Sequence, residues 1–472
     1  EQFSATRETR TSVAFVNCTF RRCYGNFGGI VMAYTKHALT SFSNCHLTDS
    51  GATLEPGSLG GVFLFGAAFQ ELEVHDSVLD GLQARTSGAV FYLGQNGQAD
   101  IYQTSVRMVN TNITHCRAYD STVMFVGGDD NTFPLQVGST RFNRVELRNC
   151  SLIHNVAREF GGVANIAQGL NSVHLIGCLV ANNSATYAGA FHVYKAYASL
   201  TQMGDKYADD WLEVEPALRL TRTVISGNSA DIDGGVLTMY DVVHVVVEGS
   251  TLVNNSAMND GGVVLSDAVL DRNRLVMHNC VVTFNHAQNN GGVIFARGSS
   301  GNDVSESILE ENTALLGGVF SFKSGVASLV MTSSQVVGNV ADYSGGAFFV
   351  GGDEGTTLVV HDVVFAQNKA KQSPGSGGAM VLSGHTHATL VRVTARDNTA
   401  PQGNGGFAIL VTPYTQLSLQ DSTIQSCSAT RLGGGLAVVF GASLQVSNVT
   451  FANNSVTSHL SGGGGAIAYL RN

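Results

Sequence analysis

Charged residues are scarce in this sequence. They make up 13% of its 472 residues, and proline occurs only 6 times. A disordered chain would contain more of both. No stretch of 18 or more residues is uninterruptedly apolar, so the sequence shows no membrane-spanning helix. The net charge of −10, without a long acidic or basic run, argues against nucleic acid and anionic lipid as partners.

Glycine, in contrast, is abundant at 55 residues, and much of it belongs to a repeat. The repeat unit is a Gly pair followed by an apolar run, as in Gly234-Gly235-Val236-Leu237 and Gly317-Gly318-Val319-Phe320. From Gly29 to Gly465, 14 steps cover 436 residues, which is about 31 residues per repeat. One longer step contains an insertion around residues 203–217.

Short segments with a period of two, without helical periodicity, separate the Gly pairs. This pattern favours a β-solenoid over a helical repeat. The sequence therefore predicts an all-β fold, a right-handed single-stranded parallel β-helix of about 15 coils that forms a single domain over residues 1–472. Neither end shows a polar cap. We therefore expect the sequence to be a segment of a longer protein, flanked by further coils, other domains or neighbouring chains.

An asparagine recurs before the Gly pair, three residues after an apolar one and two before an alanine. Its side-chain amide can bond the turn backbone of its own coil and of the next. We expect an internal ladder of Asn155, Asn183, Asn228, Asn255, Asn285, Asn312, Asn339, Asn368, Asn398 and Asn454.

The third residue after each Gly pair should point away from the core, because the second and fourth are apolar and should face it. This outward position is itself mostly apolar. It predicts a protein interface of Met32, Leu64, Phe91, Phe125, Leu265, Phe295, Phe349, Val381, Ile409 and Val438. Two alternatives stay open. Loops of the same chain could cover the face, or the facing could be misassigned, because parallel sheets are often apolar on both sides.

Eight cysteines occur, and five of them share a small inward position. Stacking in register would bring Cys18 next to Cys45 and Cys150 next to Cys178, near the range of a disulfide. Free buried thiols are the favoured interpretation, and a stacked disulfide in either pair is the alternative. No CxxC spacing is present, which argues against zinc.

No catalytic cluster is evident. Asp129-Asp130 and Asp353-Glu354 follow strands in coils too far apart to form one site, and Asp209-Asp210 lies in the insertion. His385 and His387 would share one face without a third ligand. We predict no catalytic residues, no metal and no cofactor. Possible N-glycosylation sites are Asn17, Asn112, Asn149, Asn182, Asn254 and Asn448.

The two repeat motifs together, Phe/Ile/Leu-x-x-Asn and Gly-Gly-Ala/Ile/Leu/Val, resemble the repeat of chlamydial polymorphic outer-membrane proteins and of pectin-lyase-like parallel β-helix proteins. The resemblance covers essentially the whole chain. It implies a secreted, surface-displayed segment used in adhesion. The chain departs from that family in having no membrane barrel and many Gly pairs followed by valine.

The sequence thus favours a secreted or cell-surface structural or adhesive subunit of an assembly or filament. Its expected partners are other protein chains, including copies of itself, or glycans, with no nucleic acid and no membrane insertion of this segment. Two alternatives on the same fold are a polysaccharide lyase or hydrolase and a carbohydrate-binding module.

Overall fold

The computed structural model describes residues 11–26, 29–33, 38–52, 61–65, 70–93, 103–127, 142–167, 170–194, 215–352, 355–372, 375–457 and 463–470. The regular elements in these ranges are β-strands, β1 to β58. No helix in them is long and apolar enough to cross a membrane. The expected insertion around residues 203–217 lies outside the described residues, apart from its last three.

The chain folds as an all-β parallel β-solenoid with three parallel sheets, which confirms the expected fold class. We name them A, B and C. The solenoid has about 13 turns of ~29 residues each. In the described residues, sheets B and C contain 15 strands each. The mean repeat length of about 31 residues expected from the sequence is larger than this turn length because it includes the insertion.

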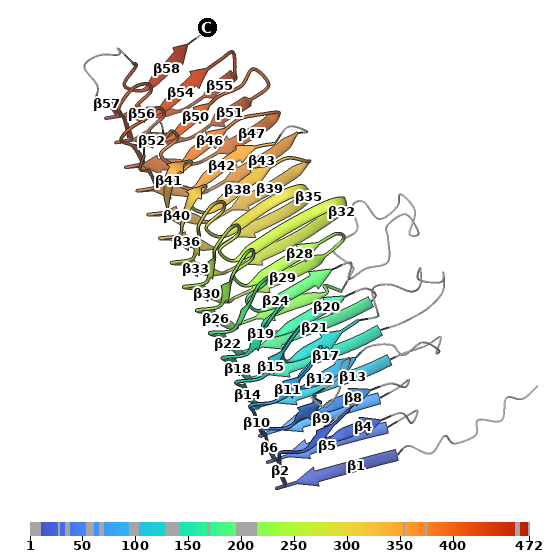
Figure 1. Ribbon diagram of the computed structural model, residues 1–472. Coiled ribbons are helices and arrows are strands. Elements are labelled where there is room, and N and C mark those ends of the chain that lie inside the picture. Colours follow the sequence, from blue (N-terminus) through green and yellow to red (C-terminus); the bar gives the residue numbers. More distant parts are fainter. Residues whose placement is uncertain are drawn as a thin grey trace, which may run out of the picture. The chain divides into compact units, whose positions relative to one another are not determined.

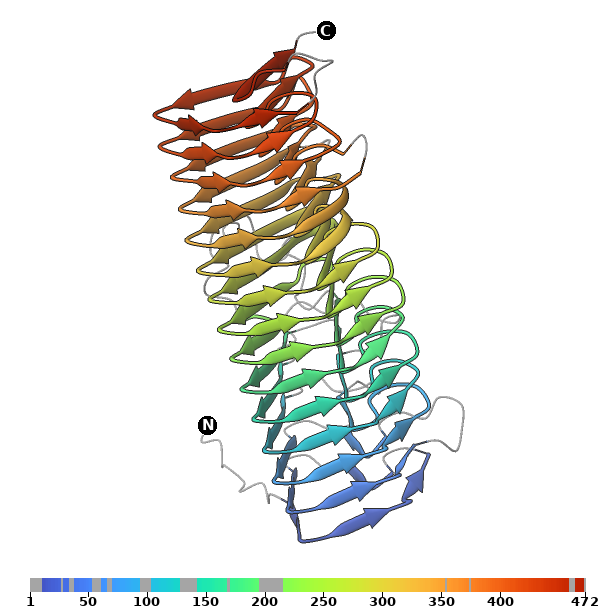
Figure 2. The same ribbon diagram turned by 90° about the vertical axis from the view of Figure 1, so that its left-hand side faces the viewer.

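The strands group into two compact units, Glu1–Thr186 with Ala190–Thr223 and Tyr187–Gly189 with Val224–Asn472. Within each unit the strands of one sheet stack in parallel along the chain (Figure 1). In Figure 2 the short strands of sheet B face the viewer.

In the first unit, sheet A contains β1 (Thr11–Val16), β4 (Val31–Ala33), β5 (Ala38–Ser43), β8 (Phe63–Phe65), β9 (Gln70–His75), β12 (Phe91–Leu93), β13 (Gln103–Val109), β16 (Met124–Val126), β17 (Phe142–Arg148), β20 (Ala164–Ala167), β21 (Leu170–Ile176), β24 (Phe191–Tyr194) and β25 (Leu218–Thr221). Sheet B contains β2 (Thr19–Arg21), β6 (His46–Thr48), β10 (Val78–Asp80), β14 (Asn112–Thr114), β18 (Ser151–Ile153) and β22 (Leu179–Ala181). Sheet C contains β3 (Tyr24–Gly25), β7 (Gly51–Ala52), β11 (Gln83–Ala84), β15 (Arg117–Ala118), β19 (Val156–Ala157) and β23 (Ser184–Ala185).

In the second unit, sheet A contains β28 (Leu237–Tyr240), β29 (His244–Glu248), β32 (Val264–His278), β35 (Ile294–Ser305), β38 (Phe320–Lys323), β39 (Ala327–Thr332), β42 (Phe348–Gly351), β43 (Thr356–His361), β46 (Met380–Leu382), β47 (Thr386–Val391), β50 (Ala408–Leu410), β51 (Gln416–Gln420), β54 (Leu436–Val439), β55 (Ser443–Ser447) and β58 (Ile467–Leu470). Sheet B contains β26 (Val224–Ser226), β30 (Thr251–Val253), β33 (Val281–Thr283), β36 (Ile308–Glu310), β40 (Gln335–Val337), β44 (Val364–Ala366), β48 (Thr394–Arg396), β52 (Thr423–Gln425) and β56 (Thr450–Ala452). Sheet C contains β27 (Ser229–Ala230), β31 (Ser256–Ala257), β34 (His286–Ala287), β37 (Thr313–Leu316), β41 (Val340–Ser344), β45 (Lys369–Ala370), β49 (Thr399–Ala400), β53 (Ser428–Ala429) and β57 (Ser455–Val456).

Single left-handed residues make the corners on either side of each sheet B strand. Asn149 (φ 51°) precedes β18, and His154 (φ 57°) follows it. Asn, Asp and Gly adopt this conformation at the least cost, which explains their frequency at these positions. One left-handed residue is enough to redirect the chain, so each coil stays short.

The Gly pair makes the corner between sheets C and A. Gly261 has a φ of 66°, and a Cβ there would lie 2.3 Å from the carbonyl oxygen of Val264. A Cβ on Gly262 would lie 2.2 Å from the carbonyl oxygen of Gly292 in the next coil. The first glycine is therefore required by the backbone conformation and the second by the contact between coils.

The core of each coil is apolar and rich in phenylalanine. In the second unit, Phe348 of β42 lies 5.0 Å from Phe320 of β38 and 5.3 Å from Phe365 of β44, measured between ring centroids. All three side chains are fully buried. Strands of sheets A and B therefore share one core, and every second residue of a sheet A strand faces it.

Candidate binding groove

The predicted interface residues are mostly not exposed. Met32 is 54% exposed and Phe349 is half-buried, whereas the other eight side chains are at most 8% exposed. The expectation that all ten present an apolar surface to solvent is therefore wrong. Two different physical reasons account for it.

For Phe91 and Val438 the assigned position was wrong by one residue. Phe91 pairs with the core residue Phe63, and Val438 pairs with Leu410. Both side chains therefore face the core. The outward residues of these two coils are Tyr92 and Ala437.

The six others, Leu64, Phe125, Leu265, Phe295, Val381 and Ile409, do alternate with core residues and point outward, but they are recessed. In the first unit, Leu64, Tyr92, Phe125 and Ala167 form a separate small apolar cluster, with the rings of Tyr92 and Phe125 stacked at 4.8 Å. These side chains bury one another on the outward face, whereas the neighbouring loops, residues 94–102 and 128–141, which the alternative of loop coverage would require, lie outside the described residues. Whether a partner also docks here stays a prediction.

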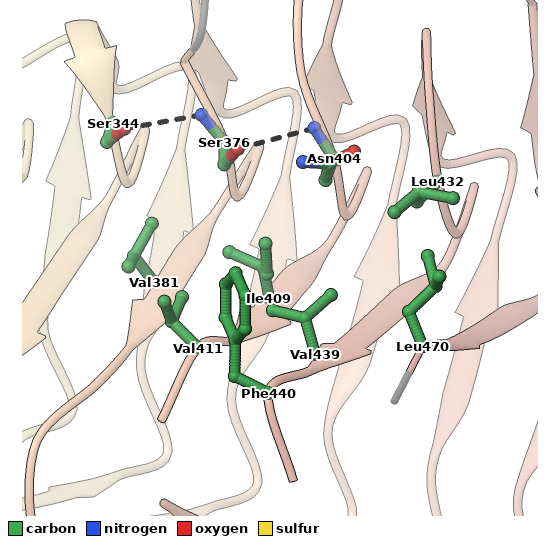
Figure 3. Close-up of a pocket in the computed structure, with 10 residues that line it drawn as sticks. All are labelled: Ser344, Ser376, Val381, Asn404, Ile409, Val411, Leu432, Val439, Phe440 and Leu470. Atoms are coloured by element: carbon green, nitrogen blue, oxygen red, sulfur yellow. Dashed lines mark hydrogen bonds between the residues drawn. The ribbon is translucent and has the colours of Figure 1, made fainter. Parts of the chain in front are cut away.

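In the second unit the recessed face opens into a groove at β46, β50 and β54. Its volume is about 380 Å³. Figure 3 shows its parts: Val381 and Ile409 rise from the strands, and Val411, Val439 and Phe440 close the side where the strands end. Val381 and Ile409 are 5% and 4% exposed, so they form the floor, whereas Phe440 is 51% exposed and forms the rim.

Residues that directly precede the Gly pairs line the opposite side of the groove. We call them the corner row, and within the groove they are Ser344, Ser376, Asn404 and Leu432. The backbone N–H of Ser376 donates to Ser344 Oγ (3.3 Å), and that of Asn404 donates to Ser376 Oγ (3.4 Å). In the next coil the position is Leu432, whose side chain offers no acceptor. Asn404 Oδ1 is buried without a hydrogen-bond partner, and it points toward Leu432 (Figure 3).

Earlier in the same unit the corner row is acidic, a feature that the sequence analysis missed. Asp233 and Asp260 are 7% and 8% exposed. Asp233 Oδ1 accepts from the backbone N–H of Asp260 (3.1 Å) and from Asn259 Nδ2 (2.8 Å). Asp260 Oδ1 in turn accepts from the backbone N–H (3.1 Å) and Nδ2 (2.6 Å) of Asn290. Aligning the residue before each Gly pair would have revealed this row, because register places such residues on adjacent coils.

Burial governs the electrostatics of this acidic row. It raises the pKa of Asp260, and the neighbouring charge of Asp233 adds to the rise, against the hydrogen bond from Asn290. Nearby, Arg297 forms an ion pair with Asp267 at 2.7 Å, and burial raises the pKa of Tyr240. The carboxylates are enclosed and engaged with backbone and amide donors. No group of three His, Cys, Asp or Glu side chains in the described ranges could hold a metal ion.

The predicted ladder asparagines form chains of hydrogen bonds. In the second unit, the Oδ1 atom of each ladder asparagine from Asn255 to Asn398 accepts two hydrogen bonds from the ladder asparagine one coil earlier. One comes from its backbone N–H and the other from its Nδ2. Each Nδ2 also donates to the carbonyl oxygen of an apolar sheet B residue one coil back, such as Val282 for Asn312. Asn155 and Asn183 are linked in the same way in the first unit. Cys427 interrupts the row, and its N–H donates to Asn454 Oδ1.

All eight cysteines are free, so neither possible disulfide, Cys18 with Cys45 or Cys150 with Cys178, is present. Each of these thiols donates toward the carbonyl oxygen two residues before it, where other coils place a serine or threonine hydroxyl. The hydrogen bond with Cys178, together with burial, raises the pKa of the Cys150 thiol. The position therefore suits a small hydrogen-bonding side chain.

The six possible N-glycosylation sites are all exposed. Five of them are left-handed corner residues, and Asn112 begins β14. His385 and His387 are exposed on either side of the buried Thr386, and the His385 ring lies 4.4 Å from that of Tyr414. Asp129-Asp130, Asp209-Asp210 and Asp353-Glu354 lie outside the described residues.

Comparison with known proteins adds no family. No family model, no curated protein and no solved structure matches the chain. The groove and its surroundings therefore have to be interpreted from their own chemistry.

Proposed function

We propose that this protein is a structural or adhesive subunit of an extracellular assembly, and that it docks a partner protein chain through the groove without catalysing a reaction. The groove is the single observation that carries the proposal. It is an open, apolar recess on a face of sheet A, and such recesses mark contact sites.

The lining of the groove supports binding in preference to catalysis. All ten lining residues are uncharged, with seven apolar side chains, two serines and one asparagine. General acid–base chemistry requires an ionisable group within reach of the substrate. The enclosed carboxylates Asp233 and Asp260 belong to earlier coils of the unit and are not among the lining residues.

Two features support an extracellular setting. The surface-exposed corners carry asparagines in Asn-x-Ser/Thr sequences, such as Asn149 and Asn254, where a glycan would meet no packing. The repeat also resembles that of polymorphic outer-membrane proteins and pectin-lyase-like proteins, and this resemblance implies display on a cell surface.

Self-association of the full chain tests the proposal. We expect sedimentation velocity to show association that rises with concentration and that is lost in Phe440→Asp, because a charge on the rim would be buried against the partner. Phe440 is half exposed, so the thermal unfolding of this variant should match that of the wild type. Phe284→Asp, at an equally exposed phenylalanine outside the groove, is the matched control. A wild-type chain that stays monomeric, or equal association of both variants, would contradict docking through the groove.

A carbohydrate-active enzyme is the second candidate, and the stacked pair of Asp233 and Asp260 favours it. Glycoside hydrolysis uses two nearby carboxyl groups, one of them with a raised pKa. A panel of acidic and neutral polysaccharides tests this candidate. Sustained release of reducing or unsaturated ends that is lost in Asp260→Asn would establish the enzyme and overturn the non-catalytic proposal.

A further inference from the structure

All Asn-x-Ser/Thr sequences of the chain lie in or beside sheet B. There are seven of them, and each belongs to the described residues. Three occupy the corner before a sheet B strand, three occupy the corner after one, and the seventh begins β14. In that order they are Asn17, Asn149 and Asn448, then Asn182, Asn254 and Asn453, and Asn112. The structure adds Asn453 to the six expected sites, because its side chain is exposed.

The six corner asparagines share one backbone conformation. Their φ angles lie between 51° and 55°, a left-handed conformation that asparagine adopts more readily than most residues. All six side chains are exposed. The serine or threonine two residues later begins the next strand, as Thr19 begins β2 and Ser256 begins β31, and none of these hydroxyl residues is buried. Acceptor and hydroxyl therefore both lie at the surface of their coil.

A sugar on a corner asparagine would leave the internal hydrogen bonds intact. In Asn182-Asn183-Ser184 the second asparagine belongs to the ladder, and its Nδ2 donates to the carbonyl oxygen of Leu152 (2.9 Å), whereas Asn182 is exposed. Asn448 Nδ2 donates to Asp421 Oδ1 of the preceding coil (2.7 Å). An N-linked sugar leaves one hydrogen on Nδ2, so this bond can persist.

The groove side of the coil is excluded from carrying such an acceptor. A Cβ on Gly406 would collide with the carbonyl oxygen of Gly434, so no asparagine can stand at this Gly-pair corner beside the groove. Phe440 on the rim and Asn448 belong to the same coil, but β55 separates them, and its five residues span about 16 Å. A glycan at Asn448 would therefore start well away from the rim.

We infer that sheet B and its two flanking corners are the glycan-bearing face of this chain in both units, N-glycosylated at these asparagines, and that the groove on sheet A stays free for the partner. The inference rests on the extracellular setting of the proposed function. The co-reactant is an oligosaccharide carried on a lipid pyrophosphate. Nδ2 forms a bond to the anomeric carbon of the sugar, the bond from that carbon to the pyrophosphate oxygen breaks, and one amide proton leaves together with the lipid pyrophosphate.

Mapping of the occupied asparagines tests the glycan-bearing face. The full chain is secreted from eukaryotic cells and treated with peptide N-glycosidase in ¹⁸O-labelled water, which converts each glycosylated asparagine to labelled aspartate for mass spectrometry. We expect label at the corner asparagines. Asp421→Asn creates Asn-Ser-Thr at an exposed left-handed corner (φ 48°) in register with Asn448, so it should add one labelled position. Asp421→Ser removes the same carboxylate without adding an acceptor and is the matched control. A secreted chain whose corner asparagines stay unlabelled would overturn the inference.

Sedimentation velocity tests whether the two faces are separate. The glycosylated chain, the same chain trimmed to one sugar per site by an endoglycosidase, and glycosylated Asp421→Asn should associate equally. Association that appears only after trimming would show that sheet B takes part in docking, and it would overturn the separation of the faces. Association that is absent from every form would overturn docking through the groove, while labelled asparagines would still support the glycan-bearing face. Unlabelled asparagines together with association that is lost in Phe440→Asp would reject this inference and leave the groove as the docking site.

Discussion

Replacing one ladder asparagine tests how much the internal amide row stabilises the solenoid. Asn312 is fully buried and takes part in four side-chain hydrogen bonds, two with Asn285 and one each with Val282 and Asn339. In Asn312→Ala, Asn285 Nδ2 still donates to Leu252, and Asn339 Oδ1 still accepts from the backbone N–H of residue 312. The backbone N–H of Asn285 and the carbonyl oxygen of Val282 each lose a bond in a site that water cannot reach.

Two buried groups that lose a partner, at about 1–3 kcal/mol each, predict a loss of about 4 kcal/mol in the free energy of unfolding. Solenoid stability is distributed over neighbouring coils, so the measurement should combine denaturant unfolding with amide hydrogen exchange at Asn285. Exchange there should accelerate more than at distant coils. Gln335→Ala, at an exposed strand position, is the control and should change stability by less than about 0.5 kcal/mol.

The substitution Cys427→Asn tests the ladder in the opposite direction, because it adds an amide where the ladder is interrupted. Sulfur is a weak acceptor, and Asn398 Nδ2 reaches Cys427 Sγ only at 3.8 Å. Cys427→Asn should restore an oxygen acceptor and raise the free energy of unfolding by about 1 kcal/mol. A cost below about 1 kcal/mol for Asn312→Ala, or a destabilised Cys427→Asn, would refute the reasoning that the amide row stabilises the coils.

Three further predictions concern titratable groups. Burial lowers the pKa of His192 to about 3. The folded state favours the neutral imidazole, so this contribution to the free energy of unfolding should be fully present above pH 6.5 and should fall as the pH drops toward 3. Denaturant unfolding at pH 7 and pH 4.5 should show this fall, and the fall should be smaller in His192→Gln. Burial raises the pKa of Asp260, so its ionisation opposes folding; Asp260→Asn should stabilise the protein more at pH 7 than at pH 4 in thermal unfolding, and a pH-independent difference would count against it. Because Cys150 is enclosed and its pKa is raised, its alkylation by a maleimide, followed by mass spectrometry, should require unfolding; rapid labelling of the folded chain would show that the site is open.

The fold was readable from the sequence because every coil repeats the same backbone requirements. Gly261 and Gly262 cannot carry a side chain, and corner residues such as Asn149 must be left-handed. These requirements are local, so the same residue types recur in the sequence at a fixed spacing. The position of each ladder asparagine follows from the same register, since only an amide at that position can bond the coils on both sides.

The candidate site was less readable for two physical reasons. Gly88 has a φ of 65°, the conformation of the first glycine in a pair such as Gly261-Gly262, so counting Gly88 as the second glycine places Phe91 on the wrong face. A run of three glycines, Gly433 to Gly435, caused the same one-residue error for Val438. Burial of Val381 and Ile409 depends on neighbouring corner and rim residues, which no single-coil pattern reveals.

The chemistry of the corner row changes along the second unit while its geometry repeats. At Asp233 and Asp260 the residue before the Gly pair is a carboxylate that bonds the next coil, and at Ser344 and Ser376 it is a hydroxyl that does the same. The row of bonds stops after Asn290 and after Asn404, whose Oδ1 atoms are buried without a partner; the backbone N–H of Leu316 donates to the carbonyl oxygen of Asn289 instead. Asn404 is one of the residues that line the groove. The side chains of one row of the repeat therefore change from carboxylate to hydroxyl to apolar along the unit, without any change in the fold.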